Sequence, residues 1–238
     1  MSSPHHQKPP IKAFVFDLDN TLVNTSKITQ VATQEVLEWL RLPAGKDLFE
    51  DFMANLTRSP EDPKGLIDVH EWRKIHMHQA FESHGQNVNM ASMTYERWNR
   101  IRLERFKISQ ELSNALVKLG SFVPIGLLTN GNCKIQQEKI AACGIRKIMN
   151  NVVICGEIGF QKPDTAAFQY IADKLNVKPS DCVMVGDSYR ADIEGALDSN
   201  FYRAIWITDK DEGVHELPQK VSKYRSTINF LENDAFVG

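Results

Sequence analysis

The stretch Ile11-Lys-Ala-Phe-Val-Phe-Asp-Leu-Asp-Asn-Thr21 decides the fold. Its beginning, as far as Phe16, is short and mostly apolar, which is typical of a strand buried in a parallel sheet. At Asp17 the chain becomes polar, so we expect the strand to end there in a loop. Where a chain stays extended, residues two apart point to the same side, so the carboxylates of Asp17 and Asp19 can face one point.

After about residue 120 the chain alternates apolar strand candidates with helical patterns. Gly144 suits the C-cap of one predicted helix and Asp164 the N-cap of another. Alternation of this kind predicts an α/β fold with a parallel sheet covered on both faces. The predicted strands are Phe122–Leu128, Val152–Cys155, Cys182–Val185 and Tyr202–Ile207, and the predicted helices are Cys133–Cys143, Asp164 to about Leu175, about Tyr189 to Asp198, and about Ile228 to Leu231.

Residues 25–105 show a different pattern, with apolar side chains at helical rather than alternating spacing, as at Trp98 and Ile101. Pro60 and Gly65 interrupt the pattern near its middle. We interpret this region as a helical insert. The expected organisation is a disordered tail (1–10), a core (11–24 and 106–238) and a helical cap (25–105).

Composition narrows the range of partners. The chain has 238 residues, a net charge of -2 and 42% hydrophobic residues, which gives no reason to expect nucleic acid or a membrane surface as partner. No run approaches the roughly 18 apolar residues of a membrane span, and the polar N-terminal tail lacks the apolar stretch of a signal peptide. The 4 cysteines show no C-x-x-C pair. We therefore expect reduced thiols and a cytoplasmic location. The sequence does not determine the oligomeric state, for which a monomer is favoured.

Polar residues follow each predicted strand. Ligands of open parallel sheets bind beyond the carboxyl ends of the strands, so these side chains are expected to converge on one edge. They are Asp17 and Asp19 after the first strand, Thr129, Asn130 and Gly131 after the second, Lys162-Pro163 after the third, and Gly186, Asp187 and Asp192 after the fourth.

This inventory suits phosphoryl transfer. A phosphate ester is anionic and repels an attacking carboxylate, so a cation must cancel that repulsion. Mg²⁺ prefers oxygen ligands, which Asp17 and Asp187 can supply. Lys162 adds positive charge for the phosphoryl oxygens, and the Thr129 hydroxyl can donate a hydrogen bond to them. Asp17 would attack while Asp19 protonates the leaving oxygen and later takes a proton from water.

Each cluster alone also has a structural interpretation. An Asp-x-Asp pair can be a turn or a helix cap, and Thr129-Asn130-Gly131 is a good turn sequence. Lys162-Pro163 can be a solvated loop, and Gly186-Asp187 can simply begin a helix. The functional interpretation depends on all four clusters occurring in order, each at a predicted strand end.

Together these clusters resemble the four motifs of the haloacid dehalogenase (HAD) superfamily. The resemblance extends from Ile11 to about Ile207 and implies a Rossmann-like core with a mobile cap inserted after the first motif. By this resemblance Asp17 is the nucleophile and a metal ligand, and Asp19 is the general acid/base, with its backbone carbonyl also on the metal. Dehalogenase members lack an aspartate at the position of Asp19, so its presence favours phosphate ester hydrolysis.

The remaining roles implied by the resemblance concern the phosphate and the metal. Thr129, Asn130 and Gly131 would hold the phosphoryl group. Lys162 would stabilise the nucleophile and the transferring charge. Asp187 would complete the Mg²⁺ site, and Asp192 would support it from behind.

A closer resemblance links Gln137–Gly144, Asp181–Asp187 and the run Trp98-x-x-x-Arg102-Leu103 to one subfamily, the animal N-acylneuraminate-9-phosphatases. It implies that the substrate is N-acylneuraminate 9-phosphate, a sugar phosphate of sialic acid biosynthesis. Two alternatives stay open. One is a phosphatase for another small metabolite, namely a nucleotide, flavin mononucleotide or phosphoglycolate, and the other is a non-catalytic binding protein on the same fold.

The cap residues that would select the substrate are less clear. Arg102, Arg73 and Lys74 are candidates for binding a sugar carboxylate by charge alone, and for Arg73 and Lys74 a solvated helix face is the competing interpretation. Trp98 and the other cap tryptophans could form a platform for a sugar ring, but their helical spacing among apolar neighbours favours packing within the cap.

Overall fold

The structure is a computed structural model that describes residues 11–42, 45–209 and 217–235. The tail predicted at residues 1–10 lies outside the described residues. The chain divides into two compact units, which we treat separately. Of the described residues, the core unit comprises 11–23, 108–131, 144–209 and 217–235, and the helical unit comprises 24–42, 45–107 and 132–143.

A six-stranded parallel sheet forms the centre of the core unit, with strand order β3-β2-β1-β4-β5-β6. The order reverses at β1, which lies between β2 and β4, so the carboxyl ends of β1 and β4 flank the switch point where α/β sheets bind ligands. The strands are β1 (Ala13–Phe16), β2 (Ile125–Thr129), β3 (Asn151–Ile154), β4 (Cys182–Gly186), β5 (Arg203–Ile207) and β6 (Val221–Tyr224).

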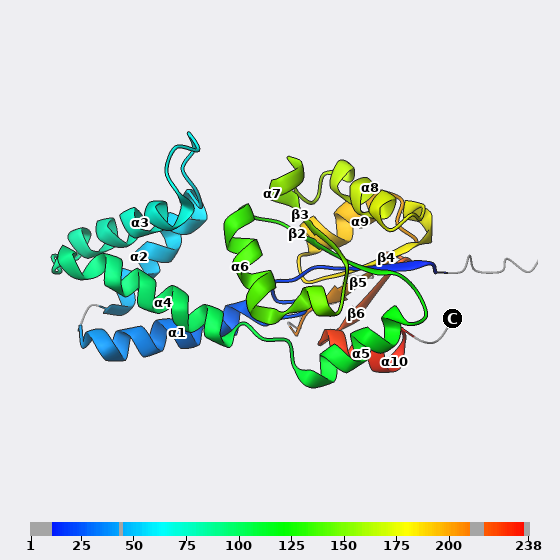
Figure 1. The fold of residues 1–238 in the computed structure, drawn as a ribbon, viewed down its shortest axis with the longest axis horizontal. Coiled ribbons are helices and arrows are strands. Elements are labelled where there is room, and N and C mark those ends of the chain that lie inside the picture. The colour runs from blue at the N-terminus through cyan, green and yellow to red at the C-terminus, as the bar shows by residue number, and fades with distance from the viewer. Residues whose placement is uncertain (1–10, 43–44, 210–216, 236–238) are drawn as a thin grey trace, which may run out of the picture. The chain divides into compact units, whose positions relative to one another are not determined.

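Helices cover both faces of this sheet (Figure 1). Side chains alternate along a strand, so Val15 of β1 packs with Phe168 of α8 (Thr165–Lys174) on one face. Phe14, its neighbour in β1, lies 6.0 Å from the ring of Phe230 in α10 (Thr227–Asn233) on the other face. Full burial of one such side chain stabilises the fold by about 1.5–3 kcal/mol.

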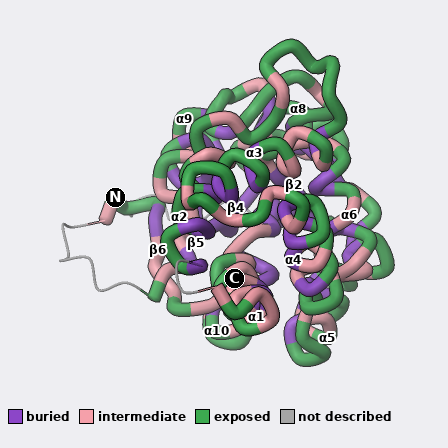
Figure 2. The backbone as a smooth tube through the Cα atoms, turned by 90° about the vertical axis from the view of Figure 1, so that its left-hand side faces the viewer, coloured by how far each residue is buried: buried purple, intermediate pink, exposed green. Residues whose placement is uncertain are grey.

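The other helices of the core unit are mostly short. Buried positions concentrate on the strands, as the purple segments of Figure 2 show along β2, β4 and β5. The helices are α5 (Gln110–Gly120), η2 (Ile145–Lys147), α7 (Cys155–Ile158), η3 (Pro179–Asp181), the π-helix η4 (Tyr189–Glu194) and α9 (Gly195–Asp198).

The helical unit packs around an aromatic centre. Phe52 meets the Trp98 ring edge-on at 5.3 Å, and Tyr95 lies against both. Trp98 is 1% exposed, so packing is the correct interpretation of this tryptophan. The helices are α1 (Thr25–Leu40), α2 (Gly45–Arg58), α3 (Val69–Ser83), η1 (Val88–Met90), α4 (Ala91–Arg105) and α6 (Cys133–Cys143).

The predicted α/β fold is confirmed, with differences in detail. The strand predicted from Phe122 begins at Ile125, because Phe122 is 67% exposed. The helix predicted from Tyr189 to Asp198 is a π-helix followed by one turn of α-helix. Sequence analysis assigned no element to α5, although Ser109 caps it and Leu112, Leu116 and Leu119 recur at helical spacing.

Two further features could not be predicted from local pattern. Strand β6 was missed because Val221-Ser-Lys-Tyr224 is short, polar and at the sheet edge, with one fully buried residue. The sequence predicts helix α6 and Asn24 as parts of the core. In the structure both group with the helical unit. A contact pattern of that kind depends on packing between segments far apart in the chain. None of the described helices is long and apolar enough to cross a membrane.

Candidate active site

The loop after β1 folds back on itself. The Asp17 amide donates to the Val185 carbonyl of β4 at 2.9 Å, which aligns the loop with the neighbouring strand. The amides of Leu22 and Val23 then both donate to the Leu18 carbonyl, at 3.0 and 3.1 Å, and close the turn. Asp17 is buried at 6% exposure and Asp19 is half-buried. The Asp-x-Asp pair therefore lies in a closed loop at the switch point of the sheet.

Lys162 is at the centre of a buried charge cluster. Its side-chain nitrogen donates to Asp17 Oδ1 at 2.7 Å and to Asp192 Oδ1 at 2.6 Å. The lysine is 4% exposed, so a solvated loop is excluded for this position. One ammonium group thus bridges two carboxylates that come from opposite ends of the core sequence.

Asn130 fixes the backbone of Lys162. Its side-chain amide donates to the Lys162 carbonyl at 2.8 Å, and its side-chain oxygen accepts from the Lys162 amide at 2.8 Å. Next to it, the Gly131 amide donates to the Gln161 side chain at 3.2 Å. The side chain predicted to hold phosphate thus holds the lysine in this structure. Thr129, only 1% exposed, places its side chain at the same end of β2.

Asp192 is held from both sides. Besides the Lys162 contact on Oδ1, its Oδ2 accepts a hydrogen bond from the Ser188 amide at 2.9 Å. A β-carbon on Gly186 would lie only 2.3 Å from Asp192 Cγ, so the residue at the end of β4 must be glycine. Both oxygens of Asp192 are committed to protein donors, which fits a supporting role.

One carboxylate oxygen from each of Asp17, Asp187 and Asp192 lies within 4.8 Å of the other two. This is the only group of three or more such side chains found in residues 11–42, 45–209 and 217–235. Three carboxylates with one nearby lysine have more negative than positive charge, and hard oxygen donors suit Mg²⁺. The residues present therefore fit a divalent cation, with Asp17 and Asp187 as the better placed ligands because Asp192 is already engaged.

Burial and charge shift the pKa values of this cluster. Burial raises the pKa of Asp17 to about 7, Lys162 opposes this, and the Asp192 and Asp19 charges add to it. Burial also raises the pKa of Asp187 to about 6, with Asp192 adding to the rise. Burial alone would lower the pKa of Lys162, but the two carboxylates raise it further than burial lowers it. The lysine is therefore charged, and added positive charge would favour ionised Asp17.

Asn20 was not singled out from the sequence. It has a φ of 57°, in the left-handed region where asparagine is enriched. Its side chain donates a hydrogen bond to Asp187, which lowers the pKa of that carboxyl against the effect of burial. The sequence feature that could have identified Asn20 is its position directly after the Asp-x-Asp pair.

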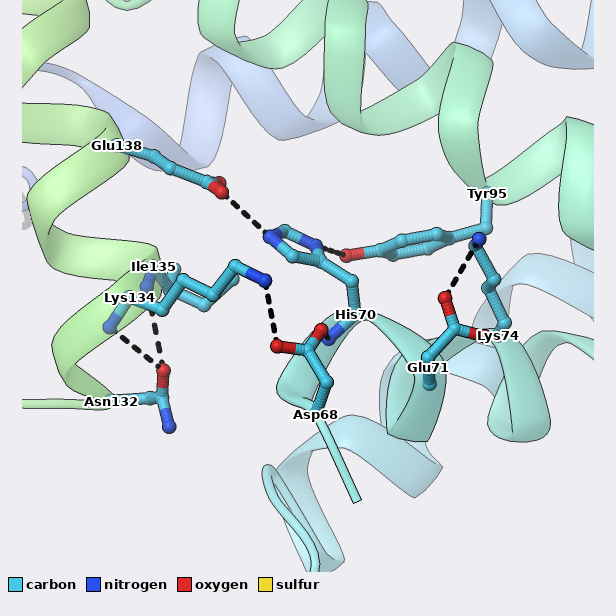
Figure 3. A network of polar contacts seen from close by, with 9 residues as sticks. All are labelled: Asp68, His70, Glu71, Lys74, Tyr95, Asn132, Lys134, Ile135 and Glu138. Carbon is cyan, nitrogen blue, oxygen red and sulfur yellow. Dashed lines mark hydrogen bonds and ion pairs between the residues drawn. The ribbon is translucent and has the colours of Figure 1, made fainter.

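The helical unit contains a network of polar contacts between its helices (Figure 3). His70 contacts the Tyr95 hydroxyl through Nδ1 and the Glu138 carboxylate through Nε2, both at 2.7 Å. The Lys134 ammonium donates to Asp68 at 2.6 Å. These contacts join α3 and α4 to α6.

Two of the cap cations named as carboxylate-binding candidates, Lys74 and Arg102, have partners within the helical unit. Lys74 pairs with Glu71 and Glu96, at 3.0 and 2.8 Å. Arg102 donates to Thr29 at 3.2 Å and lies 4.4 Å above the Trp98 ring. Lys74 is thus engaged in a surface ion-pair cluster.

The fold and these four clusters define a class: a protein with a parallel α/β core, a buried aspartate and lysine at the switch point of its sheet, and an inserted helical unit. Residues 11–200 match the haloacid dehalogenase-like hydrolase family, and the chain belongs to that family. Solved structures agree on the fold. The HAD hydrolase YfnB of Bacillus subtilis, solved with bound magnesium, is 19% identical with a TM-score of 0.67, covering 94% of this chain and 96% of that chain.

Curated relatives narrow the class. N-acylneuraminate-9-phosphatase of Rattus norvegicus is 31% identical over 86% of this chain and 85% of its own length, and that of Homo sapiens is 31% identical over 83% and 82%. Glyceraldehyde 3-phosphate phosphatase of Methanothermobacter thermautotrophicus is 26% identical over 88% and 92%. The family and these relatives make the chain a HAD-type phosphatase, a phosphomonoesterase, and confirm the resemblance drawn from its motifs.

Proposed function

We propose that this protein is a Mg²⁺-dependent phosphomonoesterase that forms an aspartyl-phosphate on Asp17, with N-acylneuraminate 9-phosphate as its substrate. The buried cluster of Asp17, Lys162 and Asp187 carries the chemical part of the proposal. It combines a nucleophile, a fixed cation and a second carboxylate at one edge of the sheet.

The first step forms a bond between an Asp17 oxygen and phosphorus while the ester P–O bond breaks. Asp19 gives a proton to the leaving alkoxide, which departs as an alcohol. Water then attacks the phosphorus, Asp19 takes the proton back, and the Asp17–phosphorus bond breaks to release inorganic phosphate. The step needs ionised Asp17, and Lys162 favours that form from 2.7 Å.

A bound Mg²⁺ would neutralise the charge repulsion between the carboxylate and the anionic ester. Asp17 and Asp187 would hold it through their carboxylates, with the Asp19 carbonyl added by family resemblance. Asp192 positions Lys162 and the end of β4 through its two oxygens. The phosphoryl oxygens would meet the Thr129 hydroxyl and nearby amides, since the Asn130 side chain holds the Lys162 backbone.

The substrate proposal is supported by the 31% identity to three mammalian N-acylneuraminate-9-phosphatases over most of each chain. Glyceraldehyde 3-phosphate phosphatases and a 5-amino-6-(5-phospho-D-ribitylamino)uracil phosphatase of Escherichia coli, at 26–28% identity, keep other small phosphorylated metabolites as the alternative. A cytosolic setting belongs to the same proposal, because all four cysteines are free thiols.

A panel of phosphorylated metabolites at equal concentration tests the proposal. It should include the 9-phosphate, glyceraldehyde 3-phosphate, nucleotides, flavin mononucleotide and phosphoglycolate, each with Mg²⁺ and with chelator. We expect the highest kcat/KM for the 9-phosphate and loss of activity with chelator. A rank below common nucleotides would remove the substrate claim. Activity equal to that of Asp17→Asn would leave only a binding protein.

A further inference from the structure

The nucleophile loop has a contact with the far end of the chain. The Thr227 hydroxyl donates to the Thr21 carbonyl at 2.7 Å, across 206 positions of sequence. Both residues are buried, with 7% of Thr21 and 2% of Thr227 exposed. A buried carbonyl at the apex of a turn needs a donor, and here the donor is a side chain of α10.

Apolar packing fixes α10 against the first strand. Phe230 lies 6.0 Å from the Phe14 ring and 5.4 Å from the Tyr224 ring, and it is 1% exposed. Ser226 caps the helix by accepting a hydrogen bond from the Asn229 amide. The family match ends at residue 200, so this anchor lies outside the matched region.

The residue before Thr21 holds an uncommon backbone conformation. Asn20 has a φ of 57°, in the left-handed region that few residues other than glycine, asparagine and aspartate adopt. This conformation is held by the Asn20 amide, which donates to the Val23 carbonyl at 2.7 Å. In it, the Asn20 side chain reaches Asp187. Because Thr21 follows Asn20 directly, the position of the Thr21 carbonyl affects the contact between Asn20 and the Asp187 carboxylate at the end of β4.

The geometry points to Thr227 as a positioning residue for the nucleophile loop. Its hydroxyl holds the Thr21 carbonyl and so reinforces the Asn20–Val23 hydrogen bond that keeps Asn20 in its left-handed conformation, with its side-chain amide on Asp187. Thr227 takes no part in bond making. The expected effect on kcat rests on the proposed function, whereas the effect on the position of the loop does not.

The test compares four variants of the full-length protein. Thr227→Val and Thr227→Ala both remove the hydroxyl but differ in packing, while Thr227→Ser keeps it. The matched control is Thr94→Val, another buried threonine, whose hydroxyl donates to the Met90 carbonyl at 2.8 Å within the helical unit. Circular dichroism checks that each variant folds. If Thr227→Val does not fold, Thr227→Ala is compared with Thr227→Ser instead.

We expect Thr227→Val to lower kcat about tenfold, equivalent to about 1.4 kcal/mol of transition-state stabilisation, with KM within about twofold. Thr227→Ala should match it, and Thr227→Ser and Thr94→Val should keep kcat within about twofold. In the metal-free protein, the amides of Leu22 and Val23 should exchange hydrogen at least about fivefold faster in Thr227→Val.

Two results would overturn the inference. One is unchanged kcat and unchanged exchange in Thr227→Val. The other is a loss confined to Thr227→Ala, which would mean that packing, rather than the hydrogen bond, matters at this position. If the wild-type protein hydrolyses no phosphomonoester, the proposed function fails, while the exchange of Leu22 and Val23 still decides whether Thr227 holds the loop.

Discussion

Replacing Lys162 with methionine removes one ammonium group and keeps a side chain of similar length. In the structure that group lies 2.7 Å from Asp17 and 2.6 Å from Asp192, with 4% of the lysine exposed. Removing one partner of a buried ion pair costs about 3–5 kcal/mol, because the remaining charge is left without compensation. We therefore expect the free energy of unfolding to fall by about that amount at pH 8.

The loss of unfolding free energy should depend on pH, and the pKa of Asp17 decides whether it grows or shrinks as pH rises. Its folded-state pKa, already raised by burial to about 7, loses the opposing effect of Lys162. A carboxyl whose folded pKa exceeds its unfolded value costs stability as pH rises from the unfolded pKa, about 3.9, through the folded pKa. At pH 5 the group can be neutral in the folded variant, so the deficit should be smaller than at pH 8.

The assay is urea unfolding of metal-free Lys162→Met and wild-type protein at both pH values. Lys12→Met is the matched control, since Lys12 pairs with Asp181 at 2.8 Å on the surface with 54% of its side chain exposed. That control should lose less than about 1 kcal/mol. A Lys162→Met deficit below about 1 kcal/mol, equal at both pH values, would refute the buried-charge argument.

Three further predictions address the metal, a thiol and a loop. Asp17→Asn should abolish turnover at any Mg²⁺ concentration, whereas Asp187→Asn should lose turnover at least about 100-fold and regain part of it in excess Mg²⁺, measured as phosphate release. Burial, helped by Asp181, raises the pKa of Cys182 to about 12, so iodoacetamide at pH 8 should label it only after unfolding, as mass spectrometry can show. Asp62 accepts hydrogen bonds from the amides of Lys64, Leu66 and Ile67, so Asp62→Ala should speed trypsin cleavage after Lys64 severalfold.

Each of these has a contrary outcome. Recovery of Asp17→Asn by added Mg²⁺ would mean that the residue acts only as a ligand. Labelling of Cys182 in the native protein would show that the strand β4 opens. Unchanged cleavage of Asp62→Ala would mean that the loop is held by other contacts, such as the hydrogen bond from Trp72 to the Ser59 carbonyl at 3.0 Å.

The class of fold and the positions of the four clusters could be predicted because both are local properties of the chain. A short apolar run that ends at Asp17 marks a buried strand and the loop after it, whatever surrounds them. The same argument located Asp187 at the end of β4 and the N-cap of α8 at Asp164, and it placed Gly144, with its φ of 67°, directly after α6. Periodicity also separated the helical insert from the strands.

Tertiary structure decided what those residues do for one another. Lys162 read alone could have been a solvated loop, and only the fold buries it between Asp17 and Asp192. Likewise, Asn130 holds the Lys162 backbone and Thr227 reaches Thr21 across 206 positions. Burial, pKa and long-range hydrogen bonds depend on which strand ends become neighbours. A local pattern of apolar and polar residues carries no information about that pairing, because the free energy that selects it comes from packing the whole core.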